Sequence, residues 1–339
     1  MEKHYSAYGV ACVQVASPSA HCKADVTKLT DHCIEMIRWA IANNANYGFP
    51  VKLVVLPECS MCGFPYCTNQ EYIDNEVFIT DPGPELDLFI ALAKELDILI
   101  CTGSCMEWDK KYPAHIFNTI WLVGPEGKIM KYRKMTPWVP DEGSCSPAQL
   151  KDYDEEFFPV ADTCCGKLGI INCYDTIFPE NSRQLAFNGC EVLLRPSAYM
   201  APFVNNDPMD WWKITSQCRS LENVMYGVHC NQGANLHEMT PFDFPGGSLI
   251  CDYEGRILSE CRLGGDRIVY GHINIDELRA WRANAYQHLG ICHLRKEAYT
   301  YMDKPLYPCK THGPNDPITM EQTISYTDAG RKIMGWDKK

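Results

Sequence analysis

The sequence predicts an α/β protein in which two mixed β-sheets pack around a sizeable core. In the first part of the chain, short apolar runs typical of strands alternate with longer segments of helical periodicity. Later runs form hairpins across glycine-containing turns, and hairpins join antiparallel strands. Strand–helix alternation and hairpins thus occur in one chain of 339 residues, 46% of them hydrophobic. This combination favours a pair of mixed sheets over a simple doubly wound sheet.

Local patterns assign the elements in order. Apolar runs predict strands over 10–15, 51–56, 98–102, 168–171, 192–194, 227–231 and 268–275, and hairpins over 117–132 and 248–259. Helical patterns predict helices over 25–45, 84–96, 179–188 and 207–225, and one that starts at Asp276. Asp207 is the expected cap of the fourth helix. Pro179 and Pro208 stand at first helical positions, where the missing N–H of proline costs nothing.

The segment CCGKLGIINCYDTIFPE (164–180) carries the first candidate for a catalytic group. Its predicted strand ends just before Cys173, and a short turn then leads to the helix that Pro179 opens. A thiol near a helix N-terminus is expected to have a lowered pKa, because unpaired N–H groups and the helix dipole favour the thiolate. The alternative is a buried, inert cysteine, which is the default for any one of the 19 cysteines in the chain.

Two other predicted strand ends carry charged residues. The run LVVLPE (53–58) ends at Glu58, and Lys134 lies in KYRKMTPWVP (131–140), directly after the first hairpin. A carboxylate and a lysine are the partners that a thiol nucleophile needs for amide hydrolysis. Each residue taken alone could equally be an ordinary charge at a strand end. A long loop over 135–154 follows, and long loops between ordered elements are usually functional or mobile.

Three motifs in this order, LPE (56–58), KYRK (131–134) and CYDTIFPE (173–180), resemble the nitrilase superfamily of carbon–nitrogen hydrolases. The resemblance covers roughly residues 8–276 and implies a catalytic triad of Glu58, Lys134 and Cys173. It also implies a four-layer α-β-β-α sandwich for a domain over 1–276. Residues 277–339 would then form a C-terminal helix and an extended tail, packed on the same domain or on a neighbouring protomer. Homo-oligomers built from dimers that pack helix layer against helix layer are expected.

The segment KYRKMTPWVPDEG (131–143) more closely resembles the corresponding loop of aliphatic amidases and formamidases. That resemblance implies that Glu142 helps to position the substrate and that Trp138 contributes to the pocket. The run RPSAYM (195–200) resembles their segment with a pocket tyrosine, here Tyr199, and the backbone N–H of Tyr174 would help Lys134 to stabilise an oxyanion. Because Asp141 stands beside Glu142, a solvated acidic turn is the alternative for that residue.

The turn after Cys173 bears on the substrate. Several carbamoyl-amino-acid and ω-amide hydrolases of the superfamily have an arginine there, which can bind a substrate carboxylate, whereas this chain has Thr176 and Ile177. The resemblance therefore implies hydrolysis of a small uncharged or cationic amide to a carboxylic acid and ammonia through a Cys173 thioester. An N-carbamoyl amide hydrolase is the alternative within the superfamily. A catalytically idle scaffold or a thiol- or metal-binding module is the alternative from another class.

Other residues that could bind metal or assist the thiol have weaker support. Cys59 and Cys62 have metal-like spacing, but neither Cys67 nor any later cysteine pair completes a structural zinc site, so we expect neither a metal nor a cofactor. A cysteine–histidine hydrolase would need a histidine beside Cys173, and the candidates in sequence are His115, His229 and His237. None of these lies in a recognisable motif, so the glutamate–lysine arrangement is preferred.

Net charge and cysteine content limit the kinds of partner and the cellular compartment that can be expected. A net charge of −12 argues against nucleic acid or an anionic membrane as a partner. No apolar run approaches the roughly 18 residues of a membrane-spanning helix, and no secretory signal is recognisable. An odd number of cysteines, 19, without such a signal is typical of reduced thiols, so a cytoplasmic location is expected.

Overall fold

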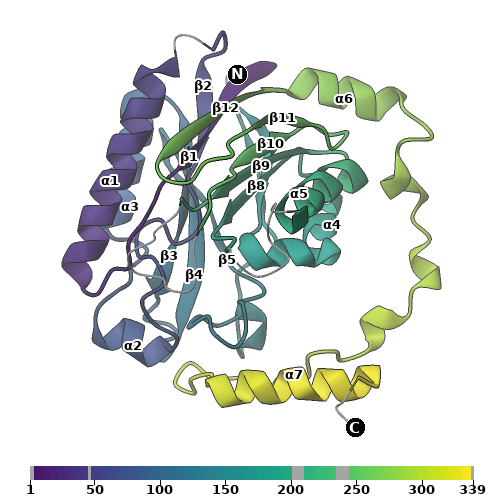
Figure 1. Cartoon of the computed structure of the whole chain (residues 1–339). Helices are drawn as coiled ribbons and strands as arrows, with labels where there is room; N and C mark the ends of the chain where they lie inside the picture. Colours follow the sequence, from purple (N-terminus) through teal and green to yellow (C-terminus); the bar gives the residue numbers. More distant parts are fainter. Residues whose placement is uncertain (1–3, 45–46, 201–209, 234–243, 337–339) are drawn as a thin grey trace.

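The computed structural model describes residues 4–44, 47–200, 210–233 and 244–336, which form two six-stranded sheets with helices on their outer faces (Figure 1). The first sheet contains β1 (Ala7–Gln14), β2 (Val51–Val55), β3 (Leu99–Trp108), β4 (Ile116–Gly124), β5 (Gly127–Arg133) and β12 (Arg267–Asn274). The second contains β6 (Val160–Thr163), β7 (Gly166–Ile170), β8 (Val192–Ser197), β9 (Tyr226–Asn231), β10 (Leu249–Cys251) and β11 (Ile257–Glu260). The α-helices are α1 (Lys23–Ala42), α2 (Asn69–Asp74), α3 (Pro84–Leu96), α4 (Pro179–Phe187), α5 (Asp210–Asn223), α6 (Ile275–Asn284) and α7 (Met320–Met334).

Both sheets are mixed, as the sequence predicts. The strand orders are β12-β1-β2-β3-β4-β5 and β11-β10-β9-β8-β7-β6. In the first sheet β1, β2 and β3 pair in parallel, and in the second β7, β8 and β9 do so, while the outer strands add antiparallel neighbours. Glu58 and Cys173 follow the ends of the parallel strands β2 and β7, so the topology brings a carboxylate and a thiol to the same end of the two sheets.

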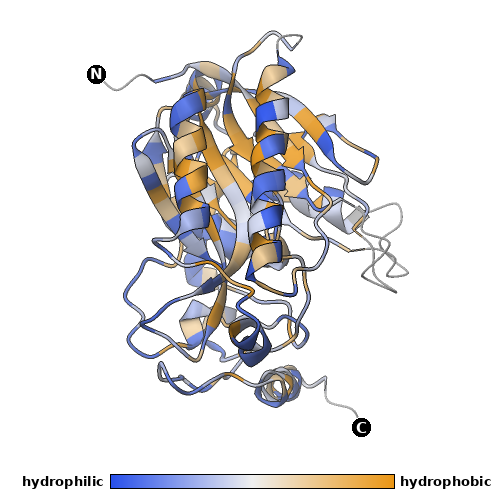
Figure 2. Cartoon of the chain, turned by 90° about the vertical axis from the view of Figure 1, so that its left-hand side faces the viewer, coloured by the Kyte–Doolittle hydropathy of each residue, from blue (hydrophilic) through white to orange (hydrophobic). Residues whose placement is uncertain are grey.

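The layers stack as helix, sheet, sheet and helix. Helices α1 and α3 cover the outer face of the first sheet, and α4 and α5 cover the outer face of the second (Figure 1). Seen from the side of α1 and α3, the strands behind them are largely hydrophobic (Figure 2). Between the sheets, side chains from both inner faces form one continuous cluster that includes Val10, Leu53, Leu168 and Leu194. The expected four-layer sandwich with a C-terminal extension is therefore confirmed.

Most elements lie within a few residues of their predicted bounds, and the differences have local causes. Strand β3 continues to Trp108, well beyond the predicted end at 102, because a register shift between Cys101 and Ser104 lets the strand bend at Gly103 and continue. The sequence analysis missed β6 and α2, which are only four and six residues long. Asp207 and Pro208 lie outside the described residues, and α5 is described from Asp210 onward.

The C-terminal tail, which the sequence analysis left without secondary structure beyond its first helix, contains α7. A capping box at Thr319 and Gln322 begins this helix, and Gly335 in a left-handed conformation ends it. From α6 the chain runs down one side of the molecule and reaches α7 at the opposite end (Figure 1). The predicted boundary after residue 276 falls inside α6, and the division of the chain at that point stays a prediction.

None of the helices in the described ranges is both long and apolar enough to cross a membrane.

Candidate active site

Lys134, Glu58 and Glu142 form a buried ion triad just beyond the ends of β2 and β5. The ammonium of Lys134 lies 2.7 Å from Oε1 of Glu58 and 2.6 Å from Oε2 of Glu142. The side chains of all three are at most 2% exposed. Glu58 follows β2 and Lys134 follows β5, so two strand ends of the first sheet deliver the first carboxylate and the ammonium. The structure therefore brings together three of the residues that the sequence singled out.

Contacts from both sheets fix the position of Glu58. Its Oε1 accepts a hydrogen bond from Nδ2 of Asn118 on β4 at 2.9 Å. Its Oε2 accepts one from the backbone N–H of Ala198, just after β8, also at 2.9 Å. Its own backbone N–H donates to the carbonyl of Ser197 at 3.3 Å. With both oxygens bound, the carboxylate has one orientation and faces Lys134.

Glu142 is a buried, hydrogen-bonded carboxylate and not the solvated acidic turn that Asp141 indicated. Its Oε1 accepts hydrogen bonds from Asn118 at 2.9 Å and from the Ser144 hydroxyl at 2.7 Å. Its Oε2 accepts the backbone N–H of Trp138 at 2.7 Å. Burial alone would raise the pKa of Glu142, but the Lys134 ammonium and these donors hold its pKa below the usual value. Glu142 is therefore ionised at neutral pH.

The charge of Lys134 is retained by the same contacts. Burial disfavours the ammonium, but the carboxylates of Glu142 and Glu58 outweigh it and raise the pKa of Lys134 well above its usual value. Its backbone N–H donates to the carbonyl of Asn118 at 2.9 Å, which ties the end of β5 to β4. A permanently charged ammonium thus lies between two carboxylates in a site nearly closed to water.

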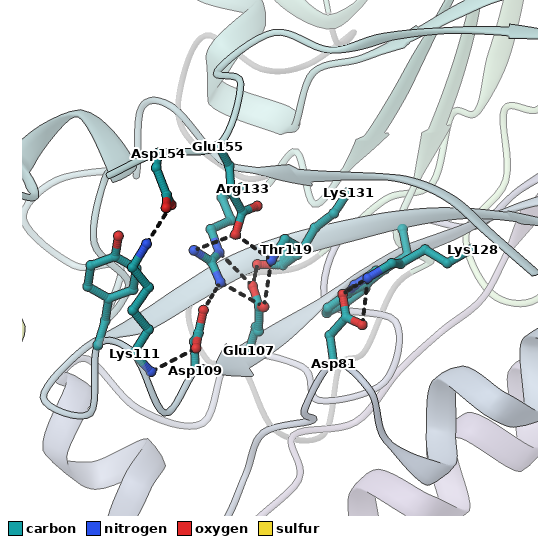
Figure 3. A network of polar contacts seen from close by, with 12 residues as sticks. Asp81, Glu107, Asp109, Lys111, Thr119, Lys128, Lys131, Arg133, Asp154 and Glu155 are labelled. Carbon is teal, nitrogen blue, oxygen red and sulfur yellow. Dashed lines mark hydrogen bonds and ion pairs between the residues drawn. The ribbon is translucent and has the colours of Figure 1, made fainter. Parts of the chain in front are cut away.

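Arg133, the residue before Lys134, holds the end of β5 from the opposite side. Its guanidinium binds both oxygens of Glu107 at 2.8 Å and Asp109 at 2.6 Å, and its side chain has no exposed surface (Figure 3). It also lies 4.0 Å from the ring centroid of Phe117. Because neighbouring side chains on a strand point to opposite faces, this anchoring directs Lys134 toward Glu58.

Cys173 lies at a sharp turn between β7 and α4. Its φ of +48° is left-handed, a conformation that costs a residue with a side chain about 1–3 kcal/mol and that is concentrated at functional sites. The turn is held by the Asp175 carboxylate, which accepts the backbone N–H of Asn172 at 3.0 Å and the hydroxyl of Tyr132 at 2.7 Å. Burial raises the pKa of Asp175 to about 6. Since Tyr132 precedes Lys134 by two residues, Asp175 links the thiol turn to the lysine strand.

The expected lowering of the thiol pKa is wrong. Burial, and then the Glu58 carboxylate, raise the pKa of Cys173 to about 12, and the opposing cations of Lys134 and Arg195 do not compensate. The 3₁₀ turn of Cys173–Ile177 separates the thiol from the first turn of α4, so loss of hydration outweighs the helix dipole. The free protein therefore holds a neutral thiol, and a nucleophile here needs a base to remove its proton.

The three predicted pocket residues flank this centre. Tyr174 follows the thiol directly, is partly buried and lies edge-on to Phe178, with ring centroids 5.3 Å apart. Trp138 is partly buried in the loop that Glu142 holds. Tyr199 follows β8, and its backbone N–H donates to Oδ1 of Asn231 at 2.6 Å. The contact of any of these three with substrate stays a prediction.

Two further buried polar residues lie at the site, and the sequence analysis missed the first of them, Asn118. Asn118 binds both Glu58 and Glu142 through Nδ2, and its Oδ1 accepts a hydrogen bond from Asn172 at 2.8 Å. Arg195 is 2% exposed, and its guanidinium lies 4.3 Å from the ring centroid of Trp212 and donates to Ser216 at 3.1 Å. A lone asparagine inside the apolar run of β4 was the available signal for Asn118.

The other candidates lie elsewhere or have other contacts. His115 contacts the carbonyl of Gly313 in the C-terminal tail, and His229 is buried with a pKa well below its usual value. His237 lies outside the described residues. Cys59 and Cys62 are buried thiols with raised pKa values, and Cys67 is exposed. Among the residues that the structure describes, no three His, Cys, Asp or Glu side chains are grouped to hold a metal ion.

Comparison with known proteins identifies the family. The family model for carbon–nitrogen hydrolases matches residues 9–283. The chain therefore belongs to the carbon–nitrogen hydrolases of the nitrilase superfamily. It is also 30% identical over 277 residues to formamidases from Bacillus cereus (strain AH820) and Bacillus anthracis, which covers 81% of this chain and 73% of each relative. The resemblance to this superfamily and to its formamidase branch is confirmed.

Solved structures share the fold. Nit3 from Saccharomyces cerevisiae, a member of branch 10 of the nitrilase superfamily, aligns with a TM-score of 0.69 at 24% identity, covering 85% of this chain and 97% of that one. A mutant of the amidase from Nesterenkonia sp. AN1 aligns with a TM-score of 0.61 at 20% identity, covering 81% and 94%. That mutant shows covalent addition of the acetamide moiety of fluoroacetamide at its active-site cysteine.

The raised pKa of Cys173 predicts that its thiol stays protonated across the neutral range. In protein labelled with ¹³Cβ-cysteine, the resonance that Cys173→Ser removes should remain at the thiol position from pH 6 to pH 9, because its pKa lies near 12. Free cysteine, with an ordinary pKa of about 8.5, provides the control under the same conditions. A Cys173 resonance that moves to the thiolate position with a midpoint below pH 9 would contradict this account.

Proposed function

We propose that the protein is a thiol-dependent amidase that hydrolyses a small linear amide to a carboxylic acid and ammonia through a Cys173 thioester. The observation that carries this proposal is the Lys134 ammonium, which is held between two buried carboxylates. Its positive charge acts on the neighbouring thiol. Family membership supports hydrolysis of a carbon–nitrogen bond, and the formamidase relatives support an amide substrate.

The first half of the proposed reaction forms the thioester. Glu58 takes the proton of the Cys173 thiol as Sγ attacks the amide carbonyl carbon, and the carbonyl oxygen becomes an oxyanion. Lys134 and the backbone N–H of Tyr174 stabilise that charge, and preorganised donors of this kind contribute on the order of 3 kcal/mol each. When the oxyanion collapses, the C–N bond breaks, Glu58 returns its proton to the nitrogen and ammonia leaves.

The second half releases the acid. A water molecule enters, Glu58 takes one of its protons, and the water oxygen attacks the thioester carbonyl. Lys134 and the Tyr174 N–H stabilise the second oxyanion as they did the first. The C–S bond then breaks, the sulfur recovers a proton from Glu58 and the carboxylic acid leaves. The raised pKa of Cys173 makes its sulfur a poor nucleophile at rest, so transfer of its proton to Glu58 is coupled to attack.

Glu142 has a separate role in this proposal. Its carboxylate is ionised and binds the Lys134 ammonium beside Glu58, with donors from Asn118 and Ser144 fixing one oxygen. Because these donors and Lys134 occupy both of its oxygens, Glu142 can position the Lys134 ammonium, and through it the substrate, while Glu58 serves the thiol. The two carboxylates cannot exchange roles, because only the one that shuttles the proton must change its protonation state.

The substrate proposed here is small and carries no negative charge next to the reacting amide. Thr176 and Ile177 supply no guanidinium in the turn after Cys173, and Glu58 and Glu142 would repel an anion. The charge of Arg195 on β8 reaches Cys173, but its guanidinium stacks on Trp212 and donates to Ser216 of α5. The formamidase relatives agree with an amide that has a short acyl group.

Ammonia release from a series of amides tests this function. We expect turnover of short uncharged amides, with kcat/KM for butyramide at least about tenfold higher than for succinamate, which replaces its methyl group with a carboxylate. Cys173→Ala should fold normally and release no ammonia. Lys134→Met should lower kcat by at least about 100-fold, because the developing oxyanion loses its cation.

Two results of this series would contradict the proposal. Preference for succinamate would mean that a cation of the protein contacts the substrate carboxylate. Normal activity in the Cys173→Ala variant would show that Cys173 is not the nucleophile. Release of carbon dioxide together with ammonia from an N-carbamoyl amine, with no turnover of simple amides, would instead identify the alternative activity.

We also propose that the protein forms homo-oligomers built from dimers that pack α4 and α5 against a second copy. Large apolar side chains are exposed on this layer: Phe187 by 61%, Ile214 and Leu221 each by 56%. Sedimentation velocity should show a dimer or a multiple of it, and Ile214→Glu with Leu221→Glu should yield monomers. Trp39→Glu on α1, a residue of similar exposure on the opposite layer, should leave the assembly intact; a wild-type monomer would contradict the proposal.

A further inference from the structure

A short stretch of the C-terminal tail adds a strand-like contact to the loop that carries Glu142. The backbone N–H of His312 donates to the carbonyl of Gln149 at 2.7 Å, and the N–H of Lys151 donates to the carbonyl of His312 at 2.8 Å. These two bonds form a parallel bridge between Leu150 and His312. We refer to residues 312–314, with their contacts, as the tail clamp.

The tail clamp has a second contact on the approach to β4. The carbonyl of Gly313 lies 2.9 Å from Nε2 of His115, and the carbonyl of Pro314 accepts the N–H of Ala114 at 3.2 Å. The side chains of His312 and His115 are both fully buried. Burial lowers the pKa of His115 and outweighs the hydrogen bond to Gly313, which would raise it, so the neutral imidazole can donate its Nε2–H to Gly313. The tail clamp thus lies between the Glu142 loop and the start of β4 and is hydrogen-bonded to both.

Both neighbours of the tail clamp lead to the ion triad within a few residues. On the loop side, the side chain of Gln149 accepts the N–H of Ser146 at 3.3 Å, and the Ser146 hydroxyl donates to the carbonyl of Met135 at 2.6 Å, next to Lys134. Ser144, two residues earlier, donates to Glu142. On the strand side, β4 begins at Ile116 and carries Asn118, which binds both carboxylates of the triad.

The loop has little else of regular structure to hold it. Between the end of β5 and the start of β6, the described chain contains only the three-residue 3₁₀ helix Pro147–Gln149. Segments with few regular hydrogen bonds lie at the low-stability end of a protein. Most of the tail before the clamp is exposed, although it also contacts the sandwich elsewhere, as where the Tyr301 hydroxyl donates to Glu180 of α4 at 2.7 Å.

Beyond the clamp, α7 is joined to the preceding chain. The Cα of Gly330 packs so closely on the chain that a Cβ there would lie 2.2 Å from the carbonyl oxygen of Leu306. The rings of Tyr307 and Tyr326 meet edge to face with centroids 5.6 Å apart. Helix α7 therefore packs on residues just before the clamp. This packing restricts the conformations that the tail can adopt on either side of the clamp.

We propose that the tail clamp is a positioning element of the active site, which holds the Glu142 loop so that the Glu142 carboxylate stays on Lys134. Its catalytic consequence rests on the amidase function proposed above, whereas its effect on loop order does not. A reacting group displaced by about 1 Å can cost on the order of 100-fold in rate, so a loosened loop should lower kcat even though no clamp residue touches substrate.

The test removes the clamp by His312→Pro, which deletes the N–H that binds Gln149 and the buried imidazole together. Hydrogen exchange of peptides within 142–151 should become faster, while exchange in β1 and β2 stays at the wild-type rate. The kcat for the best amide should fall about 10- to 100-fold, with KM changed less than about threefold. Gly290→Ala, in the same tail but with open space around the added Cβ, is the matched control and should behave as wild type.

A double-mutant cycle separates positioning from a general loss of stability. If the clamp acts through Glu142, His312→Pro should lower kcat less than about twofold further in a Glu142→Gln background, whereas independent effects would multiply. His115→Leu, which removes the donor to Gly313 and keeps an apolar side chain in its place, should reproduce a weaker form of both effects. It replaces His312→Pro if that variant does not fold.

Each outcome decides the proposal. Unchanged exchange over 142–151 in both clamp variants overturns it, and so does faster exchange with unchanged kcat, or multiplied losses in the double mutant. If wild-type protein hydrolyses no amide, the proposed function fails, but the exchange experiment still supports or overturns the clamp as the element that orders this loop.

Discussion

The buried Lys134 ammonium, held between Glu58 and Glu142, is the interaction on which the rest of the site depends. Removing an ammonium from water costs several kcal/mol, which only well-placed counter-charges can offset. Here two carboxylates lie within 2.7 Å of it, and Asn118 is hydrogen-bonded to both of them. Loss of either carboxylate would leave a buried charge that is only half compensated. The triad therefore constrains three separate chain segments to fixed positions.

The sandwich meets that constraint because its two sheets end at the same place. The first sheet delivers Glu58 and Lys134 and the second delivers Cys173, while the backbone at Ser197 and Ala198 crosses from the second sheet to fix Glu58. A neutral thiol beside the ion triad avoids a fourth buried charge in the free protein. In the proposed reaction, charge develops on sulfur and oxygen only when substrate is attacked, which is when a cation and oriented donors lower the barrier most.

Sequence patterns gave most strands and helices, because apolar runs and proline or glycine boundaries are local signals. They also placed Glu58, Lys134 and Cys173 at strand ends, and the order of the motifs linked them to one family. The direction of the Cys173 pKa shift could not be obtained in this way, since it depends on how much water the folded site excludes. The partners of Asn118 and of His312 were equally inaccessible, because each joins segments far apart in the sequence. The catalytic roles themselves stay proposals.

The most direct test of the central claim is the identity of the atom that carries the acyl group during turnover. Wild-type enzyme mixed with its best amide, quenched in acid within the first turnovers and digested, should give a peptide containing Cys173 whose mass is increased by the acyl group alone. The adduct should disappear on treatment with hydroxylamine, as a thioester does. An acyl group on another of the 19 cysteines, or turnover in a Cys173→Ala variant, would contradict the account.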